Sequence, residues 1–260
     1  MEPLHFFDAH AHLQDPRFAA DDDAVITRAK NAGVTLVVCC GTSPADWPVL
    51  AQLCSRQPSL IPAFGLHPWE IASAGNDWFD LLAQYLECFP NAGVGEIGMD
   101  HAMDPATFAR QEDAFRRQLA LARDLTRPVS VHCRKAWAAL HEVLRHTGIG
   151  EAGGMIHSWS GAPDMLPALL DFGLCISFSG TITYPRNKRA HRSIAAVPWD
   201  RLLIETDSPD QKPMGMLQSC NEPAFLPLVA QAAADLRNTP IGEIATVTRE
   251  NGLRLFEDAQ

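Results

Sequence analysis

The sequence predicts an α/β protein that forms one (β/α)8 TIM-barrel domain over residues 1–260. Eight short β-type runs alternate with helical stretches along the whole chain. Their starts are 20 to 36 residues apart, which is the length of one βα unit. Six or seven units would instead indicate an open, doubly wound sheet. No low-complexity segment or Gly/Ser linker divides the chain.

Each predicted strand is a short apolar run that is bounded by turn residues. In chain order these runs are residues 4–9, 34–40, 60–66, 92–98, 128–133, 153–157, 173–178 and 201–205. The helical stretches are residues 21–32, 44–57, 77–89, 107–126, 135–147, 163–172 and 187–196, with further helices after Glu222. In the longest stretch one face of a 3.6-residue period should pack on the sheet, and it carries Phe108, Phe115, Leu119 and Ala122.

Two helix starts carry a local signal. Ser43 precedes Pro44, and Thr239 precedes Pro240, so each proline has a hydroxyl side chain before it. A hydroxyl can cap the first N–H groups of a helix, and a proline is tolerated at the first helical position. We therefore expect helices to begin at these two prolines.

The overall charge disfavours a nucleic-acid partner. The chain has 21 Lys and Arg against 31 Asp and Glu, a net charge of −10. The charge is uneven, however, because residues 110–202 hold 13 basic and 8 acidic side chains. The basic residues Arg134, Lys135, Arg186, Lys188, Arg189 and Arg192 follow two predicted strands. They indicate either a basic side of the barrel rim or an ordinary solvated helix face.

The cellular setting is predicted from what the sequence lacks. Seven cysteines form no C-x-x-C pair, so reduced thiols fit best. The first residues resemble no signal peptide, and no run approaches 18 apolar residues. We expect a cytoplasmic protein that makes no membrane contact and needs no obligate protein partner. No long exposed apolar stripe is evident, so we also expect a monomer.

Histidines gather where a barrel carries its function, at the carboxyl ends of the strands. His10 and His12 follow the first predicted strand, and their spacing of two places both side chains on one face. His67, His132 and His157 stand at or just past three further strand ends. Two imidazoles on one face can share a metal ion, although polar residues at a loop mouth are the plain alternative.

Carboxylates occur at two of the same strand ends. Glu96 lies between apolar residues, where an unpaired charge would cost several kcal/mol. Glu205 and Asp207 share a face after the last strand. A salt bridge to an arginine could explain any one of them. Taken together, His10, His12, Glu96, His132, His157 and Asp207 provide enough ligands for two divalent ions bridged by a carboxylate.

At this point the sequence resembles a known family over nearly its whole length, the TatD-type metal-dependent deoxyribonucleases of the amidohydrolase-like barrel group. Seven ordered motifs carry the resemblance: Asp8-Ala9-His10-Ala11-His12, Gly65-Leu66-His67-Pro68, Gly95-Glu96-Ile97-Gly98, Val131-His132-Cys133-Arg134, Ile156-His157-Ser158-Trp159-Ser160-Gly161, Phe178-Ser179-Gly180-Thr181-Ile182-Thr183-Tyr184 and Glu205-Thr206-Asp207-Ser208-Pro209. The chain departs from the family at Met99-Asp100-His101, where Leu-Asp-Tyr is frequent, and at Asp210, where Tyr is frequent. Both departures lie near the expected substrate cleft.

The resemblance implies a ligand set and a reaction. His10, His12 and Asp207 would bind one divalent ion, His132 and His157 a second, and Glu96 would bridge them; magnesium, manganese and zinc all remain open. The implied reaction removes nucleotides from the 3′ end of DNA. A ligating Glu, in place of a carboxylated Lys, argues against the lactone and phosphotriester branches of the wider group.

Roles for individual residues follow. We predict Asp207 and Glu96 as catalytic, with Asp207 placed to orient the attacking water and to take its proton. Arg134 follows His132 by two residues and could bind a phosphate with its planar fork, although a surface position is the alternative. The resemblance makes His67 a substrate contact. Tyr184 and Trp159 are candidates for stacking on a sugar or base, and Glu205 could fix a metal ligand or form a core salt bridge.

Two other functions remain open. The same pair of ions could hydrolyse an ester or amide, such as the aminoacyl ester of a charged tRNA. The barrel could instead bind metal without catalysis, although the intact ligand set counts against this.

Overall fold

The computed structural model of the chain describes residues 3–256, apart from the side chain of Asp22. It contains eight parallel strands in one sheet, in the order β1 to β8. The strands are β1 (Phe6–Ala11), β2 (Val34–Cys40), β3 (Leu60–Phe64), β4 (Gly93–Asp100), β5 (Val129–Arg134), β6 (Gly154–Ile156), β7 (Leu174–Phe178) and β8 (Leu202–Ile204).

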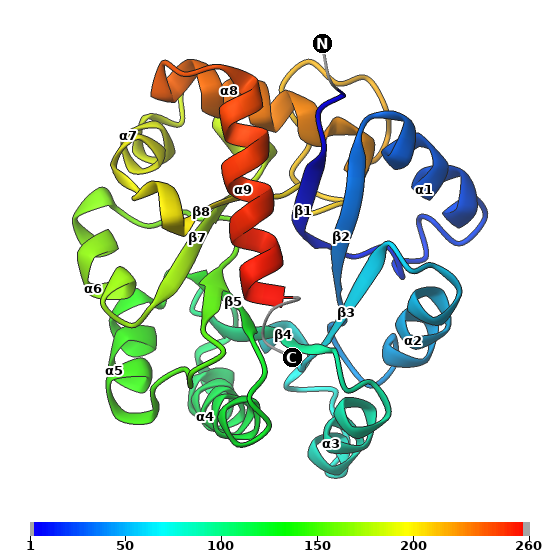
Figure 1. Cartoon of the computed structure of the whole chain (residues 1–260). Coiled ribbons are helices and arrows are strands. Elements are labelled where there is room, and N and C mark those ends of the chain that lie inside the picture. The colour runs from blue at the N-terminus through cyan, green and yellow to red at the C-terminus, as the bar shows by residue number, and fades with distance from the viewer. Residues whose placement is uncertain (1–2, 257–260) are drawn as a thin grey trace.

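Helices surround the strands, as Figure 1 shows. They are α1 (Asp22–Asn31), α2 (Trp47–Arg56), α3 (Trp78–Cys88), α4 (Phe108–Asp124), α5 (Trp137–Thr147), α6 (Leu166–Leu170), α7 (Lys188–Ala196), α8 (Leu226–Arg237) and α9 (Ile241–Phe256). Short 3₁₀ turns join them: η1 (Pro68–Glu70), η2 (Pro105–Thr107), η3 (Pro163–Met165), η4 (Gly180–Thr183), η5 (Trp199–Arg201) and η6 (Pro223–Phe225). The predicted (β/α)8 barrel is confirmed.

The barrel is closed between β1 and the segment that follows β8. Ala11 pairs with Ser208 in an isolated parallel bridge. The N–H of His12 donates to the carbonyl of Ser208 at 2.7 Å, and the N–H of Asp207 donates to the carbonyl of His10 at 2.9 Å. The buried carboxylate of Asp8 accepts from the N–H and hydroxyl of Thr206. These contacts bring His10, His12 and Asp207 to one point of the rim.

One end of the barrel is covered and the other is open. Helix α9 crosses the middle of the view in Figure 1 and packs on β1 and β8. Its last turn joins an apolar cluster inside the barrel, where Phe256 stacks on Phe7 at 6.2 Å between ring centroids. Since Phe7 stands near the start of β1, α9 covers the amino-terminal end. The carboxyl ends of the strands are left for the site.

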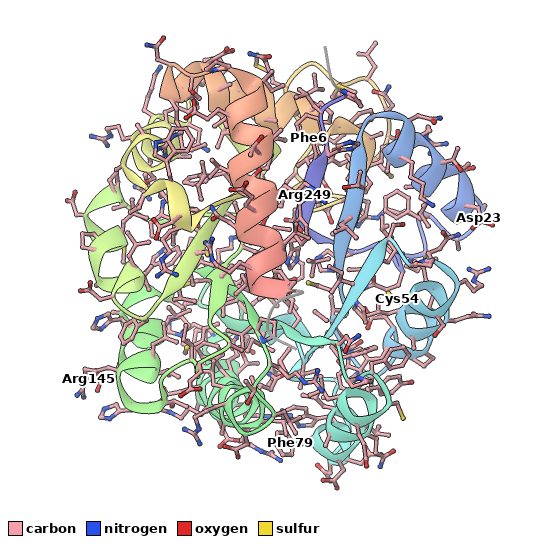
Figure 2. All side chains as sticks on the ribbon, in the orientation of Figure 1. Phe6, Asp23, Cys54, Phe79, Arg145 and Arg249 are labelled. Atoms are coloured by element: carbon pink, nitrogen blue, oxygen red, sulfur yellow. The ribbon has the colours of Figure 1, made fainter. Side chains whose placement is uncertain are left out.

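The main apolar core lies between the strands and the outer helices. Of the four residues predicted to form the inner face of α4, Phe115, Leu119 and Ala122 are buried, whereas Phe108 is partly exposed. At the periphery, Figure 2 shows side chains such as Arg145 of α5 and Phe79 of α3. Among the described residues no helix is both long enough and apolar enough to span a membrane.

Several element boundaries differ from the sequence prediction. Strand β1 spans residues 6–11 instead of 4–9, because the polar Asp8 and His10 are buried through hydrogen bonds and continue the strand. Helix α2 begins at Trp47 instead of Pro44, after a turn in which the Asp46 carboxylate accepts from the N–H groups of Thr42 and Ser43. Helix α9 likewise begins at Ile241, one residue after Pro240.

Candidate metal centre

The six residues predicted to bind metal come together at the open end of the barrel, around the carboxylate of Glu96. Glu96 lies within β4 and is 3% exposed. Its Oε2 atom is 3.3 Å from Nε2 of His10 and 3.3 Å from Nε2 of His12. Its Oε1 atom is 2.9 Å from Nδ1 of His132 and 2.8 Å from Nε2 of His157. Each oxygen of this carboxylate therefore faces a different pair of imidazoles.

Asp207 lies on the side of His10 and His12. Its Oδ1 atom is 3.9 Å from Nε2 of His10 and 3.5 Å from Nε2 of His12. Its Oδ2 atom accepts a hydrogen bond from the side-chain amide of Gln211 at 2.5 Å. The backbone of Asp207 has a φ of +54°, in the left-handed region, which turns the chain sharply just after β8.

The far nitrogen of each imidazole in this set meets an acceptor. Nδ1 of His12 is 2.7 Å from the Cys40 carbonyl, and Nδ1 of His10 is 2.9 Å from the Ser130 hydroxyl. Nε2 of His132 is 3.3 Å from the Asp100 carboxylate; Nδ1 of His157 makes no hydrogen bond but lies 3.4 Å from Oε1 of Glu205. Such acceptors hold the ring proton on the far nitrogen and leave the lone pair of the other nitrogen for a metal.

His67 has the opposite arrangement. Its Nδ1 accepts a hydrogen bond from the N–H of Trp69 at 3.2 Å, so the neutral ring carries its proton on Nε2. That Nε2 lies 3.2 Å from Oε1 of Glu96. His67 is close enough to join the ligand group on distance alone. Its hydrogen bonding instead makes it a donor toward Glu96, and the contact of His67 with substrate stays a prediction.

The acidity of the two central carboxylates is set by these imidazoles. Burial raises the pKa of Glu96, but His157, His67 and His10 more than offset it and hold the pKa well below its ordinary value. The same competition between burial and the neighbouring imidazoles, His12 first among them, lowers the pKa of Asp207 to about 2. Both side chains are therefore ionised acceptors at neutral pH.

The histidines respond to the same charges. Burial lowers the pKa of His157 and His12, yet Glu96 together with Glu205 or Asp207 raises both well above the ordinary value. Burial prevails for His10 and His67, whose pKa values are lowered. The donor set of imidazoles and ionised carboxylates fits divalent ions, which would compete with protons for the same lone pairs.

Asp100 is a site residue to which the sequence reasoning assigned no role. It ends β4, and its Oδ2 atom accepts from the indole N–H of Trp69 at 2.7 Å while facing His132. Burial opposes ionisation of Asp100, but the hydrogen bonds from His132 and Trp69 outweigh it and lower the pKa. The signal was its position four residues beyond Glu96, which strand alternation places on the same face.

A cleft of about 1010 Å³ lies over this centre. Its lining includes five exposed basic residues that follow β5 and β7: Arg134, Arg186, Lys188, Arg189 and Arg192. Arg134 therefore stands at the predicted mouth. Tyr184 is 43% exposed but does not belong to the lining, and Trp159 is buried against Trp137. Glu205 is fully buried and contacts His157, as expected for a residue that fixes a ligand.

Comparison with known proteins gives a consistent result. The family model described as TatD related DNase matches residues 7–257. The chain is 33% identical to a protein of Pantoea vagans named 3′-5′ ssDNA/RNA exonuclease TatD, covering 96% of this chain and 98% of that protein. It is 30% identical to an uncharacterized metal-dependent hydrolase, YabD, of Bacillus subtilis, covering 96% and 98%. The crystal structure of YjjV, a TatD homologue from Escherichia coli, superimposes with a TM-score of 0.92 at 32% identity, covering 96% of this chain and 97% of that one.

Proposed function

The chain belongs to the TatD-related DNase family of metal-dependent hydrolases, and on that premise we propose that it is an exonuclease that removes nucleotides from the 3′ end of single-stranded DNA. The observation that carries the proposal is the placement of the Glu96 carboxylate, because each of its two oxygens faces a different pair of imidazoles. This arrangement suits two divalent ions, of magnesium, manganese or zinc, that share one bridging carboxylate.

The residues divide the work as follows. His10, His12 and Asp207 would hold one ion, His132 and His157 would hold the other, and Glu96 would supply one carboxylate oxygen to each. When bound, such ions supply Lewis acidity to the phosphoryl group and lower the pKa of water. Asp207 is ionised and adjacent, so it orients the attacking water and accepts its proton. The N–H at Nε2 of His67 donates to a phosphate oxygen, and Arg134 binds a neighbouring phosphate through its guanidinium.

The charge around the cleft supports a nucleic-acid substrate despite the net charge of −10. Five exposed basic side chains gather on the part of the rim that follows β5 and β7. The basic residues on the other side include Arg17, which is held between Asp15 and Asp210 at 2.9 Å from each. A flexible strand end can meet this local positive charge without a broad basic surface.

A substrate panel tests the proposal. The metal-loaded protein is incubated with a 5′-labelled single-stranded DNA, the same sequence as duplex and as RNA, and an aminoacyl ester of RNA. We expect a ladder of products shortened one nucleotide at a time from the 3′ end of the single-stranded DNA. Hydrolysis of the acyl ester with every oligonucleotide left intact would refute a nuclease and favour an esterase.

Two variants connect the activity to the centre. Glu96→Gln and Asp207→Asn should each abolish the ladder, and Glu96→Gln should lower the metal content measured by elemental analysis from two ions per chain. Asp164→Asn changes an exposed carboxylate in η3 and serves as the matched control. A Glu96→Gln protein that keeps both ions and full activity would contradict the bridging role.

A further inference from the structure

Trp69 is a large aromatic side chain beside the metal centre, and folding leaves half of it exposed to solvent. It lies in η1, directly after β3, lines the cleft, and is 50% exposed. Its ring centroid is 5.0 Å from that of His67 and 6.3 Å from that of His132. Its place in the cleft beside the reacting centre, more than its exposure alone, makes this ring a surface on which a ligand with an aromatic face can stack.

The position of the indole is fixed. Its N–H donates to Oδ2 of Asp100 at 2.7 Å, and Asp100 is fully buried. The preceding Pro68 restricts the backbone at the start of η1. Because the ring is held in advance, a group that stacks on it loses little affinity to the ordering of the side chain.

Four basic residues of the cleft lie on the far side of the centre from Trp69, in the segment 186–192 after β7. Two others lie elsewhere on the rim, Arg134 at the end of β5 and Arg17 after β1. In a barrel whose strands run in order from β1 to β8, β3 and β7 are opposite each other. The phosphates of a bound strand would gather at the basic side, which leaves the Trp69 side for the end of the strand that carries no further phosphate.

We propose that Trp69 is the stacking platform for the base of the 3′-terminal nucleotide. This inference rests on the proposed function. In the reaction a water oxygen forms a bond to the scissile phosphorus, and the bond from phosphorus to the 3′ oxygen of the penultimate nucleotide breaks. That 3′ oxygen gains a proton, and the terminal nucleotide leaves as a 5′-monophosphate. The base on Trp69 therefore belongs to the departing nucleotide.

The other aromatic residues considered for this role are less suitable. Trp159 lines the cleft but is only 2% exposed and packs on Trp137 with 4.7 Å between ring centroids. Tyr184 is exposed but does not line the cleft. A base has a face of the same kind whichever nucleotide carries it, so the platform on Trp69 binds all four bases with little preference.

Removal of the ring tests the platform when it is combined with removal of the base. The rate constant kcat/KM is measured for wild type and Trp69→Ala on single-stranded DNA with a normal 3′-terminal nucleotide and on the same strand with an abasic 3′-terminal residue. We expect Trp69→Ala to lower kcat/KM about 5- to 150-fold on the normal strand. On the abasic strand the two proteins should be alike, because the partner of the ring is already absent.

A conservative variant separates stacking from the support of Asp100. Trp69→Phe keeps an aromatic face but loses the indole N–H, so it should retain most of the preference of wild type for the normal strand over the abasic strand. A third strand that is abasic at the penultimate position should show the same loss in Trp69→Ala as the normal strand.

Three results would overturn the platform. The first is an equal loss for Trp69→Ala on the normal and terminally abasic strands, which would make Trp69 a positioning residue. The second is a loss of kcat/KM in Trp69→Ala that persists on the terminally abasic strand and disappears on the strand abasic at the penultimate position, which would place the penultimate base on the ring. The third is an unchanged kcat/KM. If wild type cleaves no oligonucleotide, the exonuclease proposal fails first, and the platform fails with it.

Discussion

Replacement of Asp100 by Asn tests whether this buried carboxylate sets the proton position on His132. Asp100 faces three N–H donors: the indole of Trp69 at 2.7 Å, the backbone of Ala102 at 2.8 Å and Nε2 of His132 at 3.3 Å. An Asn side chain has one oxygen and one NH₂ group. Whichever way it turns, its NH₂ group meets at least one N–H, and a buried donor loses its partner.

The magnitude follows from two independent considerations. An unsatisfied buried donor costs about 1–3 kcal/mol. Loss of a group that orients a metal-binding histidine lowers metal affinity by about 10- to 100-fold, which is ~1.4–2.7 kcal/mol. The loss should fall on the ion held by His132 and His157, because Asp100 contacts His132 and does not contact His10 or His12.

Calorimetric titration of the metal-free protein with Zn²⁺ or Mn²⁺ measures this effect. Wild type should show two binding events, and Asp100→Asn should weaken one of them about 10- to 100-fold while the other is unchanged. Asp164→Asn, an exposed change in η3, should bind like wild type. If both events keep their affinity while the thermal unfolding temperature falls, Asp100 supports only the fold and the reasoning is refuted.

Three further predictions concern the basic residues of the cleft, the close contact between β4 and β5, and the ion pair between Arg17 and Asp15. Arg186→Ala with Arg192→Ala should reduce the salt slope of single-stranded DNA binding by about 1.4 in log units, measured by anisotropy, whereas Arg145→Ala on the outer side of α5 in Figure 2 should leave it unchanged. Gly98→Ala should lower the free energy of unfolding by more than about 3 kcal/mol, because φ is +141° and a Cβ would lie 2.0 Å from the His132 carbonyl. Gly148→Ala, also at positive φ but in open space, should cost about 1–3 kcal/mol in urea unfolding, and equal losses would disprove the clash. The hydrogen bond from Arg17 lowers the pKa of Asp15. Arg17→Gln should therefore cost about 0.2–1 kcal/mol above pH ~4, and the difference should vanish as acid protonates Asp15; a pH-independent difference would contradict the pairing.

The strand ends were the most predictable part of the site. A strand alternates its side chains with a period of two, so His10 and His12 had to share a face once β1 was recognised. Parallel strands place their carboxyl ends at one rim, so the strand pattern alone groups Glu96, His132, His157 and Asp207. The structure places the four histidines around the carboxylate of Glu96 and Asp207 beside two of them.

Helix starts and the supporting residues were less predictable. Pro44 is permitted at the first position of a helix, but the Asp46 carboxylate binds the N–H groups of Thr42 and Ser43 and delays α2 to Trp47. A propensity describes one residue, whereas this competition depends on where a side chain three residues away can reach. Asp100 appeared in the sequence only as part of a motif that departs from the family, because its role depends on contacts with Trp69 of η1 and His132 of β5.

The sequence alone determined the repeated βα units, the eight-stranded barrel and the identity of the clustered imidazoles and carboxylates, because each is encoded in local periodicity and in the shared direction of parallel strands. Only the tertiary structure decided which oxygen of Glu96 faces which imidazoles, that His67 is a hydrogen-bond donor, and that Trp69 and not Tyr184 presents its ring to the cleft. The contacts of Glu96 join atoms that are 36 to 86 residues apart, the proton position on His67 depends on the backbone geometry of η1, and the exposure of Trp69 depends on which surface remains uncovered after packing. None of these quantities is carried by a local sequence pattern.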